Sequence, residues 1–128
     1  MDIRTHHLID QEFCGQPVDL RPGLCRVSFT AIDRMAADDR GLVHGGFVFG
    51  LADYAAMLAV NDPNVVLGAA SIKFLKPVSV GDRISAEARV SEVKGRKHLV
   101  DVIVSRDGES LLEGQLTCFV LDRHVLDS

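Results

Sequence analysis

A long apolar stretch from Gly45 to Val60 is the sequence feature that most constrains the fold. Only Asp53 and Tyr54 interrupt it, and its alanine, leucine and methionine residues favour a helix of more than four turns. The segment Asn61-Asp62-Pro63-Asn64 is expected to end that helix. A helix that is apolar on every side has to be covered on every side. The rest of the chain must therefore provide a surface that surrounds it.

Alternation of apolar and polar residues with a period of two predicts strands on both sides of the helix. The predicted strands are 24–31 before the helix, and 65–76, 83–93, 97–105 and 111–121 after it. Short turns, among which Asp107-Gly108 is a strong hairpin signal, predict that the last four strands form an antiparallel meander. Residues 1–23 are expected to form a short irregular or helical lead-in.

This order of elements predicts an α+β fold in which one curved antiparallel sheet wraps around a long central helix, an architecture known as the hot-dog fold. We expect a single hot-dog domain over residues 24–128, preceded by the lead-in 1–23. One sheet of five strands is too small to surround the helix completely. We therefore expect a homodimer, or a dimer of dimers, in which two sheets join and two helices lie together.

Composition and charge argue against several other classes of protein. The 128 residues carry 14 Lys and Arg against 18 Asp and Glu, a net charge of −4, whereas a nucleic-acid binder is expected to be basic. Cys14, Cys25 and Cys118 are odd in number and widely spaced, so we expect neither a disulfide framework nor a metal site. No apolar run reaches membrane-spanning length, and the N-terminus lacks a signal-peptide pattern. We expect a cytoplasmic protein with no cofactor and no nucleic-acid or membrane partner.

Asp53 is the one acidic or basic residue inside the apolar helix. Burial of a carboxylate is unfavourable unless the group is paired or hydrogen-bonded. One interpretation is functional: a general base or nucleophile whose pKa is tuned by partial burial. The other is structural: Asp53 faces a solvent-lined gap or caps a neighbouring strand.

The segment His44-Gly45-Gly46 lies where a polar connector becomes the apolar helix. The first turn of a helix has free backbone N–H groups at the positive end of its dipole. Two glycines let a ligand approach those groups closely, so the pair is a candidate site for a carbonyl oxygen that gains negative charge. The structural alternative is a tight turn into the helix, with His44 as a hydrogen-bonding residue at its start.

Spacing along the helix separates these two features within one chain. His44 and Asp53 are nine positions apart in the sequence, which corresponds to roughly 13 Å along a helix axis. The two residues of one chain therefore cannot act on one small reaction centre. Two antiparallel helices across a dimer axis could bring Gly45 of one chain to Asp53 of the other, and would create two sites per dimer.

Two motifs surround these candidates. The first contains Gly41, His44-Gly45-Gly46 and Leu51-Ala52-Asp53, and the second is Ser71-Ile72-Lys73-Phe74-Leu75-Lys76-Pro77 followed by Gly81-Asp82. Together they resemble the signature of hot-dog acyl-CoA thioesterases of the phenylacetate-degradation type. The resemblance extends over about residues 24–121.

The resemblance implies a role for each matching residue. Asp53 corresponds to the acid that activates water or attacks the thioester, Gly45 to the N–H that polarises the thioester carbonyl, and His44 to a histidine that helps to position it. Many members of that family have Asn six residues before the His. This chain has Asp38 there, and an ionised carboxylate accepts hydrogen bonds but does not donate them.

An acyl-CoA substrate is anionic, so a chain of net negative charge needs a local group of cations to bind it. Lys94, Arg96 and Lys97 cluster at one predicted turn. Lys73 and Lys76 lie near the end of another strand, and Arg83 follows the next turn. The alternative interpretation of each cation is simple solvation at a turn. The expected substrate-binding residues are Gly46, Phe47, Lys73, Phe74, Lys94, Arg96 and Lys97.

The leading hypothesis is therefore an acyl-CoA thioesterase that needs no metal or cofactor. A second hypothesis is a non-enzymatic acyl-CoA-binding protein or sensor of the same fold, and Asp38 is the residue that motivates it. A third is a hot-dog dehydratase acting on hydroxyacyl thioesters. Release of free thiol, binding without release, and formation of an enoyl product distinguish the three hypotheses.

Overall fold

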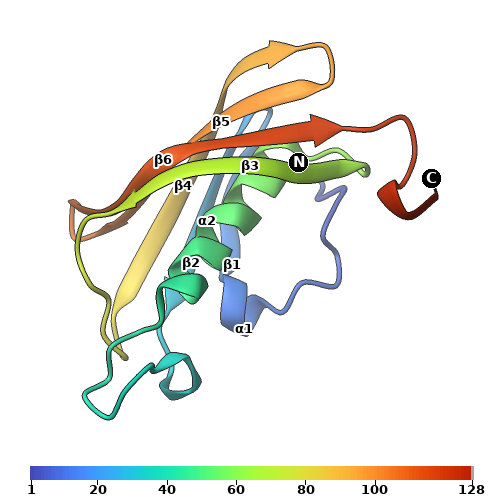
Figure 1. Cartoon of the computed structure of the whole chain (residues 1–128). Coiled ribbons are helices and arrows are strands. Elements are labelled where there is room, and N and C mark those ends of the chain that lie inside the picture. The colour runs from blue at the N-terminus through green and yellow to red at the C-terminus, as the bar shows by residue number, and fades with distance from the viewer. Residues whose placement is uncertain (128) are drawn as a thin grey trace.

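A six-stranded antiparallel sheet curves around one long helix in the computed structural model, which describes residues 1–127 (Figure 1). The predicted α+β hot-dog architecture is therefore confirmed. The elements in chain order are α1 (Gln11–Cys14), β1 (Gln16–Arg21), β2 (Leu24–Thr30), the 3-10 helix η1 (Asp33–Met35), α2 (Gly45–Val60), β3 (Val65–Phe74), β4 (Arg83–Lys94), β5 (Lys97–Arg106), β6 (Glu109–Val120) and the 3-10 helix η2 (Val125–Asp127).

The strand order β1-β2-β4-β5-β6-β3 differs from the predicted meander. Strands β4, β5 and β6 are consecutive neighbours, as predicted, because turns of two residues leave no other choice. Strand β3, however, pairs with β6, and β2 takes the place beside β4. The connection 75–82 between β3 and β4 is long enough to cross the end of the sheet, so the prediction that β3 is part of the meander was wrong.

A sixth strand comes from the lead-in, where the sequence analysis expected irregular or helical structure. Gln11–Cys14 is indeed helical, but Gln16–Arg21 forms β1 and pairs with β2 through the turn at Pro22 and Gly23. Strand β1 lies at the edge of the sheet and its register shifts between Pro17 and Asp19. An irregular edge strand lacks clean alternation, so the period of two did not reveal it.

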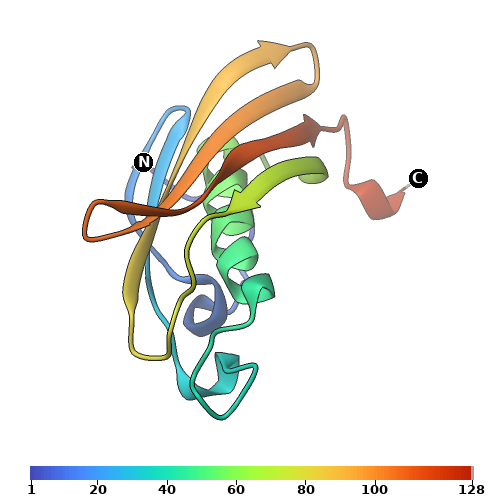
Figure 2. The same ribbon diagram turned by 60° about the vertical axis from the view of Figure 1, so that its left-hand side comes forward.

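Helix α2 occupies the predicted residues and forms the centre of the core (Figure 2). Its buried residues are Val48, Leu51, Ala52, Tyr54, Ala55, Ala56, Met57, Leu58 and Ala59. It packs mainly against β2, β4 and β5, whereas its contacts with β3 and β6 are fewer. No helix within residues 1–127 is long and apolar enough to cross a membrane.

The N-terminal segment runs along α2 from its last turn to its first. Asn61, which ends α2 in a left-handed conformation, is 7% exposed. Its side-chain Oδ1 accepts from the Arg4 N–H at 2.8 Å, and its Nδ2 donates to the Asp2 carbonyl at 2.9 Å. At the other end, the Phe13 ring stacks on Phe47 with centroids 5.7 Å apart. The segment therefore covers a side of the helix that the sheet leaves open.

One stripe of α2 is not covered within the protomer. Gly46 is exposed, and Phe49, Gly50 and Asp53 are only half-buried, at positions that share one helix face. Beside it, edge strand β3 exposes its apolar face, with Phe74 54% exposed. The expectation that an all-apolar helix must be covered on every side is thus met everywhere except along this stripe.

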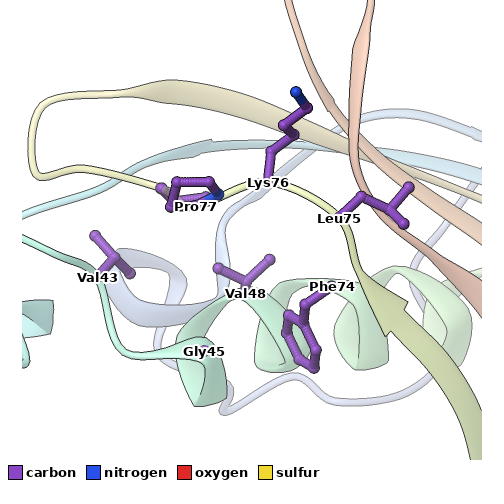
Figure 3. Close-up of a pocket in the computed structure, with 8 residues that line it drawn as sticks. Val43, Gly45, Val48, Phe74, Leu75, Lys76 and Pro77 are labelled. Carbon is purple, nitrogen blue, oxygen red and sulfur yellow. The ribbon is translucent and has the colours of Figure 1, made fainter.

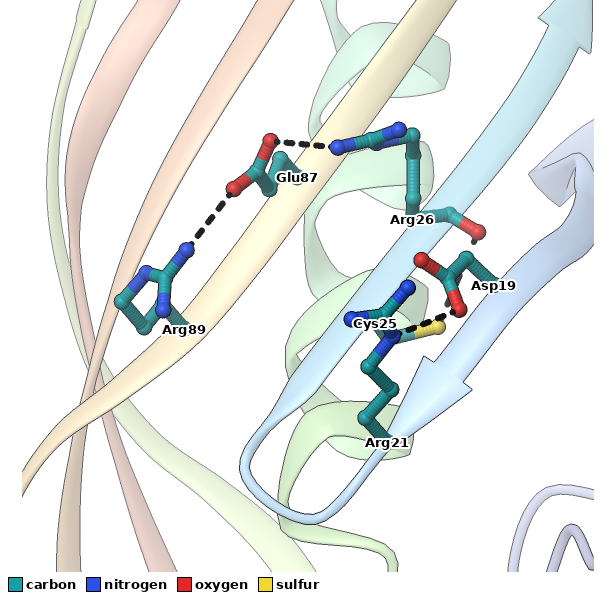
Figure 4. A network of polar contacts seen from close by, with 6 residues as sticks. All are labelled: Asp19, Arg21, Cys25, Arg26, Glu87 and Arg89. Atoms are coloured by element: carbon teal, nitrogen blue, oxygen red, sulfur yellow. Dashed lines mark hydrogen bonds and ion pairs between the residues drawn. The ribbon is translucent and has the colours of Figure 1, made fainter. Parts of the chain in front are cut away.

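The outer face of the sheet is polar and carries a row of ion pairs (Figure 4). Glu87 on β4 accepts from Arg26 on β2 and from Arg89 on its own strand, each at 3.3 Å. All three side chains are well exposed, so these pairs contribute little to stability. The face that packs on α2 is apolar, which is the division expected of a sheet with one solvated side.

Substitution of Gly114 by Ala should destabilise the fold by about 2 kcal/mol or more. The added methyl group would clash with backbone atoms, which cannot move aside as a side chain can. A Cβ at Gly114 on β6 would lie 2.3 Å from the Ser71 carbonyl oxygen of β3. Gly68→Ala is the matched control, since its Cβ would meet chiefly the Phe119 ring at 2.4 Å, and a ring can shift. Thermal or urea unfolding should rank Gly114→Ala as the less stable variant, and equal stabilities would contradict this account.

Candidate active site

The chain enters α2 through a short backbone ladder. The Val43 N–H donates to the Val78 carbonyl at 2.8 Å, and the Val80 N–H donates to the Gly41 carbonyl at 2.9 Å. On the opposite side, the His44 N–H donates to the Met35 carbonyl at 2.9 Å. Residues 41–44 are therefore held from both sides, and the position at which α2 begins is set by backbone hydrogen bonds.

His44 and Gly46 pack against each other at the start of the helix. A Cβ on Gly46 would lie 3.0 Å from Cδ2 and Nε2 of His44, so the imidazole folds back over that glycine. The ring also meets Phe47 edge-on, with centroids 6.1 Å apart. The His44 side chain makes no capping hydrogen bond to the helix. Its orientation thus comes from packing, and its ring nitrogens are not used to cap α2.

Gly45, the first residue of α2, borders a cleft of about 330 Å³ (Figure 3). The cleft is lined by Val43, Gly45, Val48, Phe74, Leu75, Lys76, Pro77 and Val78. The Phe74 ring lies beside Gly45, at 3.5 Å from where a Cβ would be. The N–H of a first helical residue has no partner inside its helix, and the helix dipole favours negative charge there. The cleft therefore combines apolar walls with the first residue of a helix, whose N–H has no partner inside that helix.

Asp53 lies two turns further along α2, on the uncovered stripe. Its Oδ1 is buried and has no hydrogen-bond partner within residues 1–127. Burial raises the pKa of the Asp53 carboxyl above its ordinary value. Burial, together with a smaller contribution from the Asp53 charge, raises the pKa of the Cys118 thiol to about 12. A carboxylate that is partly desolvated and unsatisfied is a better base than an exposed one.

Gly45 and Asp53 are separated along the helix, as the sequence spacing predicts. Eight residues of α2 correspond to about 12 Å along its axis. Within one protomer the Gly45 N–H and the Asp53 carboxylate are thus in separate places. Asp53 faces the open stripe, and Gly45 faces the cleft beside edge strand β3.

Asp38 has a structural function that the sequence analysis did not foresee. Its Oδ1 accepts from the N–H groups of Arg40, at 3.0 Å, and Leu42, at 3.1 Å. These bonds shape the loop that leads into the ladder at residues 41–44. Only an acceptor oxygen is required, and the side chains of Asp and Asn both supply one. The structure does not place Asp38 among the residues that line the cleft.

Of the predicted cations, Lys76 lines the cleft of its own protomer and the others do not. Lys73 on β3 is paired in register with Glu113 on β6, and the next residue, Phe74, is paired with the buried Leu112. Lys73 and Phe74 therefore lie on opposite faces of the sheet. Lys94, Arg96 and Lys97 surround the β4–β5 turn, which lies near the last turn of α2 and far from Gly45 (Figure 1).

Some of these cations already have acidic partners. Arg96 is ion-paired with Asp122, and Lys94 with Glu92 at 3.3 Å. Phe74, by contrast, lines the cleft as a substrate-binding residue is expected to, whereas Phe47 packs between His44 and Phe13.

Several residues of this site had no assigned role in the sequence analysis. Leu75 and Pro77, which were part of the second motif, form one wall of the cleft together with Lys76, a predicted candidate for phosphate binding. Cys14 and Cys118 lie close enough to Asp53 for its charge to raise the pKa of each thiol. No local signal marks them, since their proximity to Asp53 arises from packing between α1, α2 and β6.

The groups available define what this arrangement can do. Within residues 1–127 no three His, Cys, Asp or Glu side chains are grouped as metal ligands. The site offers a helix N-terminus, an imidazole and a carboxylate of raised pKa. These groups can hold a carbonyl oxygen and take a proton from water.

Comparisons with known proteins agree with this architecture. The chain is 54% identical over 123 residues to a methylthioribose-1-phosphate isomerase of Aquifex aeolicus, covering 95% of this chain but only 27% of that protein. It is 28% identical over 120 residues to the transcription factor FapR of Caldanaerobacter subterraneus subsp. tengcongensis, covering 93% of this chain and 60% of FapR. The chain thus spans about a quarter to three fifths of the length of these relatives.

A solved structure and a family profile give the fold and the family. The uncharacterized protein PH1136 from Pyrococcus horikoshii superposes with a TM-score of 0.98 at 51% identity, covering 99% of this chain and 98% of that one. The profile described as thioesterase superfamily matches residues 40–113, which include α2 and the strands β3 to β5. Because this match covers more than half of the sequence, the chain belongs to the thioesterase superfamily.

Proposed function

We propose that the protein is an acyl-CoA thioesterase that hydrolyses a thioester to a free acid and coenzyme A. The observation that carries the proposal is the Asp53 carboxylate, whose Oδ1 is buried and unsatisfied in an otherwise apolar helix. Such a group destabilises the folded state, so its presence indicates a functional role. Membership of the thioesterase superfamily and the motif around His44 and Gly45 support the same reaction.

The proposed reaction uses two groups on α2. Asp53 takes a proton from a water molecule, whose oxygen attacks the thioester carbon. Alternatively, the carboxylate attacks that carbon and forms a mixed anhydride, which a water molecule then hydrolyses to the free acid and the regenerated carboxylate. The Gly45 N–H donates to the carbonyl oxygen as it becomes an oxyanion. On either route the C–S bond breaks, and coenzyme A leaves as a thiolate that takes up the proton given by the attacking water. His44 is proposed to position the thioester, with its ring held over Gly46.

We also propose that the active unit is a homodimer, alone or within a dimer of dimers. Edge strand β3 has ten residues and leaves unpaired backbone groups, and Phe74 and the α2 stripe are apolar surface beside it. A second copy that pairs along β3 would satisfy the strand and cover the stripe. With two antiparallel helices, Asp53 of one protomer comes toward Gly45 of its partner.

Antiparallel pairing would also supply the missing cations. Strand β3 begins near the last turn of α2 and ends with Phe74 beside Gly45. The partner's strand runs the other way, so its β4–β5 turn would lie at the end of the sheet where this protomer has its cleft. Lys94, Arg96 and Lys97 of that turn would then be close to the phosphates of coenzyme A. The cytoplasmic location remains part of this proposal.

A second candidate function is acyl-CoA binding without hydrolysis. The match to the transcription factor FapR, which covers 93% of this chain, favours it. Asp38 no longer supports this second candidate, because its carboxylate accepts hydrogen bonds within the loop before α2. Both functions use the same cleft, so release of thiol from bound acyl-CoA distinguishes them.

Asp53→Asn should lower kcat for acyl-CoA hydrolysis by about a hundredfold or more, since it removes the base but keeps the side-chain shape. Thiol release from short, long and phenylacetyl-type acyl-CoAs is the assay. Asp101→Asn, an exposed carboxylate on the outer sheet face, is the matched control and should keep the wild-type rate. Turnover unchanged by Asp53→Asn would remove Asp53 from the mechanism, and binding without thiol release by the wild-type chain would favour the second candidate.

Stability should depend on pH through the same carboxyl. Burial raises the native pKa of Asp53, so the unfolded chain loses this proton at lower pH than the native protein does. The native state therefore loses stability as pH rises from about 4, the unfolded value, through the raised native pKa. Asp53→Asn lacks this loss, so it should be more stable than wild type at pH 7 and equal to it near pH 3. The measurement is the unfolding midpoint of both proteins from pH 3 to pH 7. A difference between wild type and Asp53→Asn that is the same at pH 3 and at pH 7 would contradict the raised pKa.

Complementation between two inactive variants should show whether the site spans two chains. Gly45→Pro removes the proposed donor N–H, and proline is well tolerated at the first position of a helix. Gly45→Ala keeps the N–H and should stay active. Co-expressed Gly45→Pro and Asp53→Asn chains should regain about a quarter of wild-type activity, because half of random dimers have one intact site of two. A mixture as inactive as either variant would place both groups in one chain.

A further inference from the structure

The loop between β3 and β4, residues 75–82, belongs to both the cleft and the backbone ladder. Leu75 to Val78 line the cleft, and Val78 and Val80 are bonded to the segment that leads into α2. Any displacement of this loop would therefore displace the residues just before Gly45. What holds the loop in place from its far side is thus relevant to the candidate active site.

Arg106, the last residue of β5, holds this loop from behind. Its Nη1 donates to Asp82 Oδ2 at 2.7 Å and to the Pro77 carbonyl at 3.2 Å, and its Nη2 donates to Glu109 Oε1 at 3.2 Å. The side chains of Arg106 and Asp82 are each only 25% exposed. Partial burial makes this pair stronger than the exposed ion pairs on the outer sheet face.

Further bonds extend the grip of Arg106 over the loop. Asp82 Oδ2, which Arg106 contacts, also accepts from the Ser79 N–H at 2.9 Å. Glu109 is 3.9 Å from the Nζ of Lys76, a residue of the cleft wall. The guanidinium therefore acts at Pro77 directly, at Ser79 through Asp82, and at Lys76 through Glu109.

We propose that Arg106 is a positioning residue for the active site. It fixes loop 75–82, the loop fixes residues 41–43 through the backbone ladder, and those residues set where the Gly45 N–H points. Its role in turnover rests on the proposed thioesterase function, whereas its hold on the ladder does not. Small displacements of a catalytic donor have large effects on rate, so a residue outside the cleft can control kcat.

Arginine is suited to this position for a geometric reason. Its planar guanidinium presents several N–H groups at fixed angles, and here they reach acceptors on the loop and on β6 at once. Lysine has a single ammonium group and cannot span the same three acceptors in one geometry. Arg106→Lys should therefore keep part of the effect, and Arg106→Gln should lose most of it.

The test combines amide hydrogen exchange with steady-state kinetics. The Val43 and Val80 amides, both bonded in the ladder, should exchange about tenfold faster or more in Arg106→Gln, while amides in the β2–β4 pairing stay unchanged. The kcat for acyl-CoA hydrolysis should fall about tenfold or more, with a smaller change in KM, because the donor acts mainly on the transition state. Arg106→Lys should give intermediate values in both measurements.

Arg89→Gln is the control, since it removes the same group from an outer-face ion pair with Glu87 and should leave both measurements at wild-type values. Unchanged exchange at Val43 and Val80 in Arg106→Gln would overturn the proposed hold on the ladder. Faster exchange with an unchanged kcat would overturn the positioning of Gly45. A wild-type chain without thioesterase activity would refute the proposed function instead, and the exchange data alone would still decide whether Arg106 holds the loop.

Discussion

Burial of the apolar helix α2 is the interaction on which the rest of this structure depends. With nine of its residues buried, α2 needs a surface that follows its curvature, and one antiparallel sheet provides it by bending around the helix. The short N-terminal segment covers a further side, with its backbone held by Asn61. What remains uncovered is one stripe, and the only carboxylate of the helix lies on it. The incomplete burial of α2 and the location of Asp53 are thus two aspects of one geometry.

The start of α2 is determined by contacts that are mostly backbone. Residues 41–44 are held between the carbonyls of Met35 and Val78, and Asp38 shapes the preceding loop. The two glycines that follow leave the first helical turn open, one toward the cleft and one beneath the His44 ring. This region consists of loops from three parts of the chain. Its geometry therefore depends partly on groups that do not line the cleft, such as Met35 and Asp38.

Sequence patterns were most reliable where structure is local. The helix bounds and five of the six strands follow from period and composition, and Asp53 stood out because it interrupts an apolar run. The same patterns were wrong about the place of β3, because the pairing of strands far apart in the chain leaves no periodic trace. They missed β1 because an irregular edge strand does not alternate cleanly. Asp38 shows a similar limit, since a departure from a motif looked mechanistic until its hydrogen bonds were known.

The sequence alone determined that this chain has one apolar helix, that a curved antiparallel sheet must cover it, and that Asp53 and Gly45 are two separate chemical features of that helix. These follow from the size and polarity of neighbouring side chains, which act over one or two turns. Only the tertiary structure decided which strands are neighbours, which residues wall the cleft, and that the cations of the β4–β5 turn lie at the opposite end from Gly45. Those outcomes depend on how distant segments share one core, and no local stretch of sequence contains that information.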